Sequence, residues 1–186
     1  LKIYTLKYNA NGGSNAPSST QTNGQSFDVT ISSKTPTRNG YVFIGWSKSK
    51  SATSASFSPG STITLSENTT LYAVWTVDKY TLAYDKNTTD EVTNLPLMQA
   101  AGYEEQINIS EIIPQRIGYS FISWNTKADL SGENYNPESI YTITENSTLY
   151  ANWQINTYTV NYDMDGGSPQ IESQSGEYKS QITIWN

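Results

Sequence analysis

Carboxylates are the candidate side chains for acid–base chemistry in this chain, because the sequence contains no histidine and no cysteine. Their absence excludes catalytic triads, histidine-based proton transfer and most zinc sites. A carboxylate pair could still hydrolyse a glycosidic bond. However, Glu67 and Glu145 occupy equivalent turn-like sequences, Ser-Glu-Asn-Thr-Thr and Thr-Glu-Asn-Ser-Thr, which favours a structural role. We therefore expect that the protein is not an enzyme.

One acidic segment is similar to the start of a calcium-binding loop. It reads Asp163-Met164-Asp165-Gly166-Gly167. An EF-hand loop needs a further ligand and a glutamate at its twelfth position, whereas Ser168-Pro169-Gln170 follows here. The related segment Asn9-Ala10-Asn11 carries no charge. We therefore expect a polar hairpin turn, with no metal site and no cofactor.

The elements that position these residues belong to an internal repeat. The string TLYAVW at 70–75 returns as TLYANW at 148–153, which is an offset of 78 residues. The same offset carries residues 39–46 onto 117–124, where Gly-Tyr-x-Phe-x-x-Trp is common to both copies. Two motifs that recur in one register identify a tandem array.

The opening pattern Tyr-Thr-apolar-x-Tyr sets the number of copies, because it starts at Tyr4, Tyr80 and Tyr158. We predict one module at 1–76, a second at 77–154, and the first hairpin of a third at 155–186. A two-residue insertion falls between Tyr84 and Tyr103, so the second module should carry a longer loop there. The chain is expected to be a piece of a longer protein.

Large aromatic residues should dominate the core of such small modules, because they offer the most apolar area per residue. The chain has 14 tyrosines, 5 tryptophans and 4 phenylalanines. The predicted core residues are Tyr41, Phe43, Trp46, Tyr72, Trp75, Tyr119, Phe121, Trp124, Tyr150 and Trp153. An alternative is that some of these rings are exposed and stack on a carbohydrate.

Alternating patterns such as Tyr4 to Tyr8 predict half-buried strands. Ser32 to Thr35 and Ser110 to Ile113 are each followed by proline and predict a short helical segment, with Ser110 as its cap. The predicted fold class is α+β and strand-dominated. We expect tandem small β-grasp-like modules, each a mixed sheet with one short helical crossing.

The combined signature resembles the Listeria–Bacteroides repeat, the family that contains the B-repeat of internalin B. The motifs are Asn11-Gly12-Gly13 after the first strand, Pro36-Thr37-Arg38-x-Gly-Tyr-x-Phe-x-Gly-Trp, and Thr-Leu-Tyr-Ala-x-Trp at the end. The resemblance implies β-grasp-like modules in secreted or wall-attached bacterial proteins. The second module departs from it at Thr88-Thr89 and at Ser123, where the first has Gly12-Gly13 and Gly45.

Composition narrows the expected partners. The net charge is −6 with the basic residues scattered, which argues against nucleic acid. No apolar run is long enough to cross a membrane. The expected location is extracellular, on a bacterial cell surface or cell wall.

We expect a non-catalytic repeat segment that acts as a semi-rigid spacer or adhesion stalk. The alternative is a ligand-binding module for a glycan or for a host-cell or matrix surface protein. It would use an exposed sheet edge or the variable loops Lys48 to Ser56, Lys86 to Gly102 and Lys127 to Asn134. In that case one module should expose side chains that the other lacks.

Overall fold

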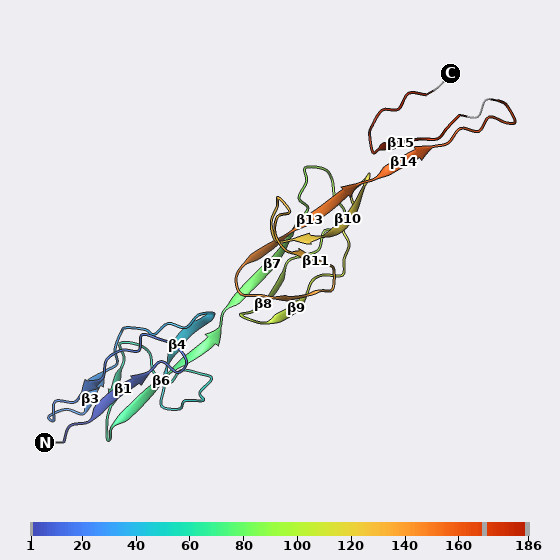
Figure 1. The fold of residues 1–186 in the computed structure, drawn as a ribbon. Helices are drawn as coiled ribbons and strands as arrows, with labels where there is room; N and C mark the ends of the chain where they lie inside the picture. The colour runs from blue at the N-terminus through green and yellow to red at the C-terminus, as the bar shows by residue number, and fades with distance from the viewer. Residues whose placement is uncertain (1, 169–170, 185–186) are drawn as a thin grey trace. The chain divides into compact units, whose positions relative to one another are not determined.

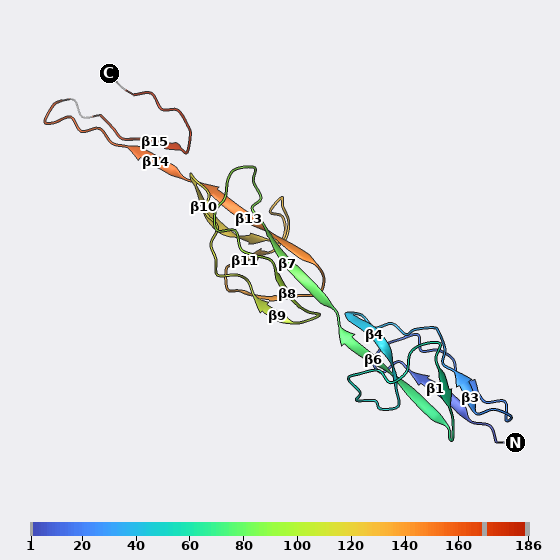
Figure 2. The same ribbon diagram turned by 180° about the vertical axis from the view of Figure 1, so that it is seen from behind.

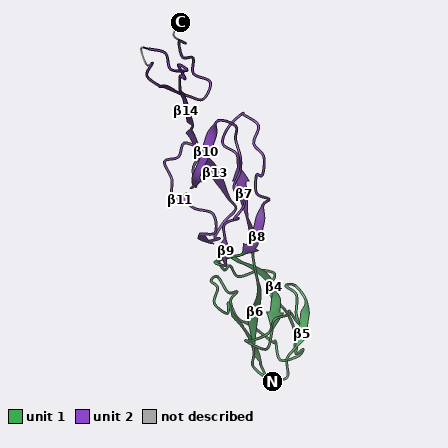
Figure 3. Cartoon of the chain, turned by 90° about the vertical axis from the view of Figure 1, so that its right-hand side faces the viewer, with its two compact units in different colours: residues 1–79, 102–104 green, residues 80–101, 105–186 purple. Residues whose placement is uncertain are grey.

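The computed structural model describes residues 2–168 and 171–184, and contacts divide the chain into two compact units (Figure 1). Unit 1 comprises Leu1–Lys79 and Gly102–Glu104, and unit 2 comprises Tyr80–Ala101 and Glu105–Asn186. Figure 3 colours unit 1 green and unit 2 purple. Unit 1 therefore holds the first sequence repeat with residues 77–79 and 102–104 of the second, and unit 2 holds the rest of the second repeat and the partial third.

The first repeat forms six strands: β1 (Thr5–Asn9), β2 (Thr20–Gln21), β3 (Asp28–Thr30), β4 (Tyr41–Ser47), β5 (Thr62–Thr64) and β6 (Thr69–Val77). The second repeat forms β7 (Lys79–Asp85), β8 (Gln99–Gly102), β9 (Gln106–Asn108), β10 (Tyr119–Asn125), β11 (Asn134–Tyr135), β12 (Ile140–Thr142) and β13 (Ser147–Ile155). The third contributes β14 (Thr157–Val160) and β15 (Gln174–Glu177), which pair antiparallel.

Unit 1 contains a mixed four-stranded sheet of order β2-β1-β6-β4 (Figure 2). The central pair is parallel and joins the first long strand of the repeat to its last, with Leu6 opposite Thr69. Strands β2 and β4 add antiparallel edges. Strands β3 and β5 form a separate antiparallel pair, in which Val29 faces Ile63.

The core of unit 1 draws on both sheets. Its fully buried residues are Leu6, Val29, Ile31, Trp46, Ile63, Leu65, Leu71 and Ala73. Phe43 and Tyr8 set their rings edge-on to Trp46, each with centroids 5.0 Å apart. Burial of one large indole and several aliphatic side chains between two small sheets closes the unit.

Unit 2 repeats this architecture. Its main sheet has the order β11-β10-β13-β7-β8, again with a parallel central pair, and β9 pairs with β12. Trp124 takes the place of Trp46, with Tyr84 at 4.8 Å and Phe121 at 5.0 Å. The strand that carries the tryptophan shifts register at the same point in both repeats, between Phe43 and Gly45 and between Phe121 and Ser123. Ser123 therefore supports the bulge that Gly45 supports in the first repeat.

The predicted helical crossing is wrong. Every regular element in the described residues is a strand, and both Ser32–Thr35 and Ser110–Ile113 are irregular. The Ser110 hydroxyl accepts from the Ile112 N–H as a cap would, but Pro114 follows too soon for a helical turn to propagate. The Ser110 N–H instead donates to the Tyr84 hydroxyl at 2.9 Å, and Ser32 does the same to Tyr8 at 2.8 Å.

The α+β fold class and the β-grasp-like module are wrong for the same reason. A β-grasp needs a helix packed across its sheet, and here a second strand pair, β3 with β5 or β9 with β12, covers the core residues instead. The mixed character of the main sheet matches the expectation, but the repeat is an all-strand structure built from two small sheets.

Two asparagines in the loop after the first strand tie that strand to the rest of each repeat. Asn11 and Asn87 adopt positive φ, at 50° and 49°. The side-chain amide of Asn87 donates to the carbonyls of Ala128 and Ala151, at 2.9 and 3.2 Å. Asn11 makes the same two bonds to Lys50 and Ala73. The amide therefore links the loop after β1 or β7 to a variable loop and to the last strand.

We predict that Asn87→Ala destabilises unit 2 by about 2–3 kcal/mol, because it loses both hydrogen bonds and places an alanine at positive φ. Asn87→Gly should cost less, because glycine accepts this φ. Urea denaturation of both variants measures the difference. Equal losses would mean that the backbone conformation is not part of the effect.

The buried side chain of Tyr84 connects the core of unit 2 to its outer segments through its hydroxyl group. Only 8% of the residue is exposed, and its hydroxyl bonds both the Gln99 side chain and the Ser110 N–H. Burial raises the pKa of the Tyr84 hydroxyl above its ordinary value, and the Ser110 hydrogen bond lowers it by less. The neutral phenol is therefore favoured in the folded state.

It follows that the stabilising effect of Tyr84 is complete below the unfolded pKa of about 10 and is lost as the pH rises through the folded pKa. We predict that unfolding free energy falls on going from about pH 9 to 11, and falls less steeply in Tyr84→Phe. Urea titrations at each pH test this. Parallel curves for the two proteins would exclude Tyr84 as the source.

Candidate functional site

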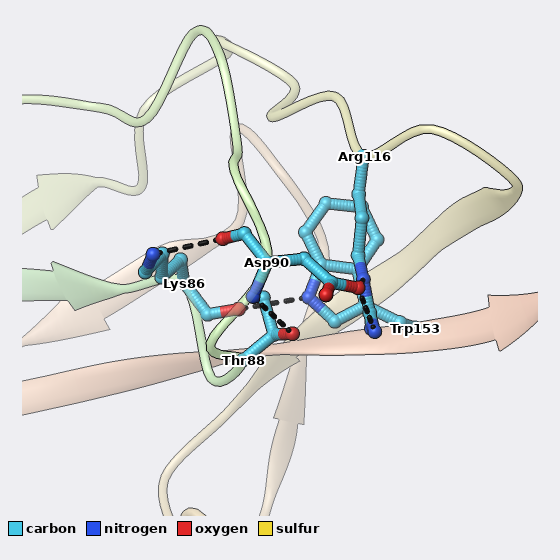
Figure 4. Close-up of polar contacts among 5 residues, drawn as sticks. All are labelled: Lys86, Thr88, Asp90, Arg116 and Trp153. Carbon is cyan, nitrogen blue, oxygen red and sulfur yellow. Dashed lines mark hydrogen bonds and ion pairs between the residues drawn. The ribbon is translucent and has the colours of Figure 1, made fainter.

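In unit 2 the side chain of Arg116 contacts an acid and two aromatic rings. Figure 4 shows the acid, Asp90, and one of the rings, Trp153. Its Nε and Nη2 atoms donate to Oδ2 of Asp90 at 2.9 and 2.6 Å. The guanidinium carbon lies 3.5 Å from the ring centroid of Tyr119 and 5.9 Å from that of Trp153. The Arg116 side chain is 14% exposed and that of Asp90 49%, so water screens part of the ion pair.

Trp153 stabilises the loop that carries Asp90. The indole N–H of Trp153 donates to the carbonyl of Lys86 at 2.8 Å, and Nζ of Lys86 donates to the carbonyl of Asp90, also at 2.8 Å. The Asp90 N–H in turn donates to the Thr88 hydroxyl at 3.2 Å. The loop with the two-residue insertion is thus ordered, and it presents a carboxylate to Arg116.

A cleft of about 450 Å³ opens beside this ion pair and is lined by Glu91, Thr93, Gln115, Arg116 and Ile117. Ile117 is 80% exposed. A smaller hollow of about 180 Å³ shares three of these residues and adds Asp90, Tyr178 and Lys179. Both signs of charge surround one aliphatic side chain here, which suits binding of an amphipathic group.

The corresponding region of unit 1 has the aromatic stack without the acid. Arg38 lies 3.6 Å over the ring of Tyr41, and the Trp75 indole donates to the carbonyl of Ala10 at 3.0 Å. In unit 2 the equivalent Arg116 adds an ion pair with Asp90 to its stack. A Cβ on Gly13 would lie 2.5 Å from the Thr37 carbonyl oxygen and 2.7 Å from the Trp75 ring, so this loop must pass close to the tryptophan.

The structure places the predicted core aromatics at three depths. Trp46 and Trp124 have no exposed surface, and their indole N–H groups have no hydrogen-bond partner in the described part of the chain. The next group packs half-buried against each core: Phe43, Trp75, Phe121 and Trp153. The remaining four are half-buried but lie outside the core clusters: Tyr41, Tyr72, Tyr119 and Tyr150.

The acidic residues that the sequence singled out take part in turns. Glu67 and Glu145 are exposed, and their backbone carbonyls accept from the Thr69 and Ser147 hydroxyls. In the acidic segment the Asp165 N–H donates to the Asp163 carboxylate, and the Gly167 N–H donates to the carbonyl of Met164. Residues 169 and 170 lie outside the described residues.

The variable loop Lys127 to Asn134 is organised by a buried residue that the sequence did not reveal. Asn125 has no exposed surface, and its side chain bonds backbone atoms of Lys127, Leu130 and Gly132. The first repeat has Ser47 at the equivalent place on its strand. None of the residues that line the cleft comes from this loop or from Lys48 to Ser56.

The second repeat exposes aliphatic side chains where the first is polar. Pro96-Leu97-Met98 precedes β8, whereas Pro17-Ser18-Ser19 precedes β2. Leu97 is 86% exposed and Met98 63%. The segment that follows Ser110 adds Ile112 and Ile113, both exposed. Gln99 donates to the carbonyl of Asn108, which brings these two segments together.

Among the described residues, no helix is long and apolar enough to cross a membrane.

We predict that Arg116→Ala destabilises unit 2 by up to about 1 kcal/mol more than Arg38→Ala destabilises unit 1, because only Arg116 combines its stack with an ion pair. Raising the salt to about 1 M NaCl should remove that excess and leave the stacking contribution. Chemical denaturation at two salt concentrations measures both terms. An excess that persists at high salt would contradict this division.

Relatives of the chain are bacterial. A protein of Evansella cellulosilytica with the provisional name Gly-rich membrane protein is 35% identical over 153 residues, which covers 78% of this chain and 18% of the relative. A second protein of that organism, provisionally named a membrane protein, is 33% identical over 159 residues, or 84% of this chain and 23% of the relative. The chain thus spans about a fifth of each relative. No solved structure matches it.

A family model matches the chain twice, at residues 4–74 and 80–152. These two matches coincide with the repeats found in the sequence, and each contains one buried tryptophan, one parallel strand pair and one arginine–tyrosine stack. The chain therefore belongs to the Listeria–Bacteroides repeat domain family.

Proposed function

We propose that these repeats form a non-catalytic segment of a bacterial cell-surface protein and act as a spacer or adhesion stalk. The observation that supports this most directly is that the features common to both repeats are engaged inside each repeat. Trp46 and Trp124 are buried, the two arginines stack on tyrosines, and Asn11 and Asn87 bind backbone carbonyls. These three shared features serve the fold of each repeat, which leaves repetition itself as the basis of the proposed function.

Repetition with a short connection gives a chain whose length grows with copy number. Residues 76–79 are all that separate the final tryptophan motif of the first repeat from the opening Tyr80 of the second. A surface protein can use such an array to place a distal domain away from the cell.

We predict that small-angle scattering will show the radius of gyration rising in equal steps as further copies of residues 77–154 are inserted after residue 154. A compact assembly would instead grow with about the 0.38 power of chain length. Growth of that second kind would sink the spacer proposal.

A second candidate function is ligand binding, and the aliphatic residues exposed only in the second repeat favour it. Leu97, Met98, Ile112 and Ile113 lie at positions where the first repeat has polar residues. A protein partner suits this chemistry better than a glycan, since Trp46 and Trp124 have no exposed face for sugar stacking.

Exchange between the repeats tests this second function. Replacing Leu97 and Met98 by serine gives the second repeat the residues of the first, and Ser18→Leu with Ser19→Met is the reciprocal change. We predict that the first variant loses at least about tenfold in binding to host-cell or matrix protein surfaces, if the aliphatic residues are the contact. If the exchanged variants and the original chain bind a glycan array equally well, the ligand is a sugar instead.

A further inference from the structure

In each unit, a tyrosine from the next sequence repeat lies against a Gly-Tyr turn. In unit 1, Tyr103 covers Gly40, and its ring centroid lies 6.4 Å from that of Tyr41 at an interplanar angle of 66°. In unit 2, Tyr178 covers Gly118, and its ring lies 6.2 Å from Tyr119 at 74°. The same edge-on contact therefore occurs twice, with different donor repeats.

A backbone ladder accompanies each ring contact. The Tyr103 N–H donates to the carbonyl of Asp78, and the Asp78 N–H donates to the carbonyl of Gly40, both at 2.9 Å. In unit 2 the Tyr178 N–H bonds Asn156, and the Asn156 N–H bonds Gly118, again at 2.9 Å. The incoming tyrosine is thus joined to the glycine through a single intervening residue.

The glycines leave room for these rings. Gly40 and Gly118 have φ of +70° and +80°, and a Cβ on either would overlap the tyrosine ring. Positive φ alone does not create such a contact, because Gly60 has φ of +78° and nothing within 4 Å of its Cβ position. The two Gly-Tyr turns therefore combine a glycine at positive φ with a surface that fits a ring.

The segments that supply the two tyrosines also share a local feature. Tyr103 and Tyr178 are each followed by a residue at positive φ, Glu104 and Lys179, which turns the chain directly after the ring. The corresponding turn of the first repeat reads Asn23-Gly24-Gln25 and offers no ring. The tyrosine is thus a feature of the second and third repeats, whose predecessors carry the Gly-Tyr turn.

We propose that the Gly-Tyr turn of each repeat is a receptor for one tyrosine of the following repeat, and that this tyrosine stabilises the end of the repeat that receives it. The partner is the next copy of the module in the same chain. Each repeat would then depend on its successor, a nearest-neighbour coupling of the kind that makes repeat arrays cooperative. The proposal holds for a spacer and for an adhesin, and so does not rest on either function.

Hydrogen exchange of the 186-residue chain, followed by NMR, tests the receptor of unit 1. Tyr103→Ala should lower the protection of the Asp78 and residue-103 amides by at least about tenfold, while the amides of the Leu6 and Leu71 strands keep theirs. Tyr103→Phe should lose less than about threefold, because the ring remains and the loss is confined to the hydroxyl, which accepts a 2.7 Å bond from Asn39.

Gly40→Ala and Gly60→Ala form the matched pair. Both place an alanine at positive φ in unit 1, but only Gly40→Ala blocks the ring. Gly40→Ala should reproduce the exchange pattern of Tyr103→Ala, and Gly60→Ala should leave Asp78 protected. Equal protection of Asp78 in these two glycine variants, or unchanged protection in Tyr103→Ala, would overturn the proposal.

The receptor of unit 2 provides a second test of the proposal, and this test does not depend on the folding of the glycine variants. Tyr178→Ala should expose the Asn156 amide and the β14–β15 hairpin, since this hairpin has no buried residue of its own. Val160→Ala is the control, because it trims the same hairpin away from the receptor. Loss of hairpin protection in Tyr178→Ala alone supports the receptor, and equal loss in both variants contradicts it.

Discussion

A repeat of this size has few large side chains with which to exclude water, and the largest of those that are fully buried is one indole per copy. Trp46 and Trp124 each pack against the ring of a tyrosine from the first strand and of a phenylalanine from their own strand. Within the part of the chain that the structure describes, neither indole N–H has a hydrogen-bond partner. An unpaired buried donor costs about 1–3 kcal/mol, so the volume and ring contacts of tryptophan outweigh that cost here.

The remaining architecture follows from closing two small sheets around that ring. The bulge at Gly45 and Ser123 marks the point where register shifts directly before each tryptophan. The tyrosines whose rings pack on the indoles accept hydrogen bonds from the Ser32 and Ser110 N–H groups through their hydroxyls, which connects the core to the segment that leads to the Gly-Tyr turn. Core packing and loop path are therefore linked through Tyr8 and Tyr84.

The sequence predicted the features that recur with a fixed period. It did not predict the features that depend on which hydrogen bonds form locally in loops and turns. Copies, strands and aromatic positions follow from patterns with a fixed period, and the structure has strands where Tyr4 to Tyr8 alternates. The helical crossing failed because a single turn before Pro36 or Pro114 cannot propagate, and serine hydrogen bonds satisfy the backbone without it. Asn87, Asp90 and Asn125 act through loop geometry, which periodicity does not report. Positive φ at Asn11 was the one readable signal, since it precedes two glycines.

The first and last long strands of each repeat pair in parallel, and this pairing affects how the repeat responds to force. In unit 1, β1 opens the repeat and β6 ends it, and four residues of β1 pair in register with Thr69 to Tyr72. Tension applied to the two ends of the repeat runs along these strands in opposite directions, so it shears all their hydrogen bonds together instead of unzipping them singly. The rate of unfolding under load is then set by simultaneous rupture of this clamp, and a tethered array would resist pulling with a threshold repeated in each copy.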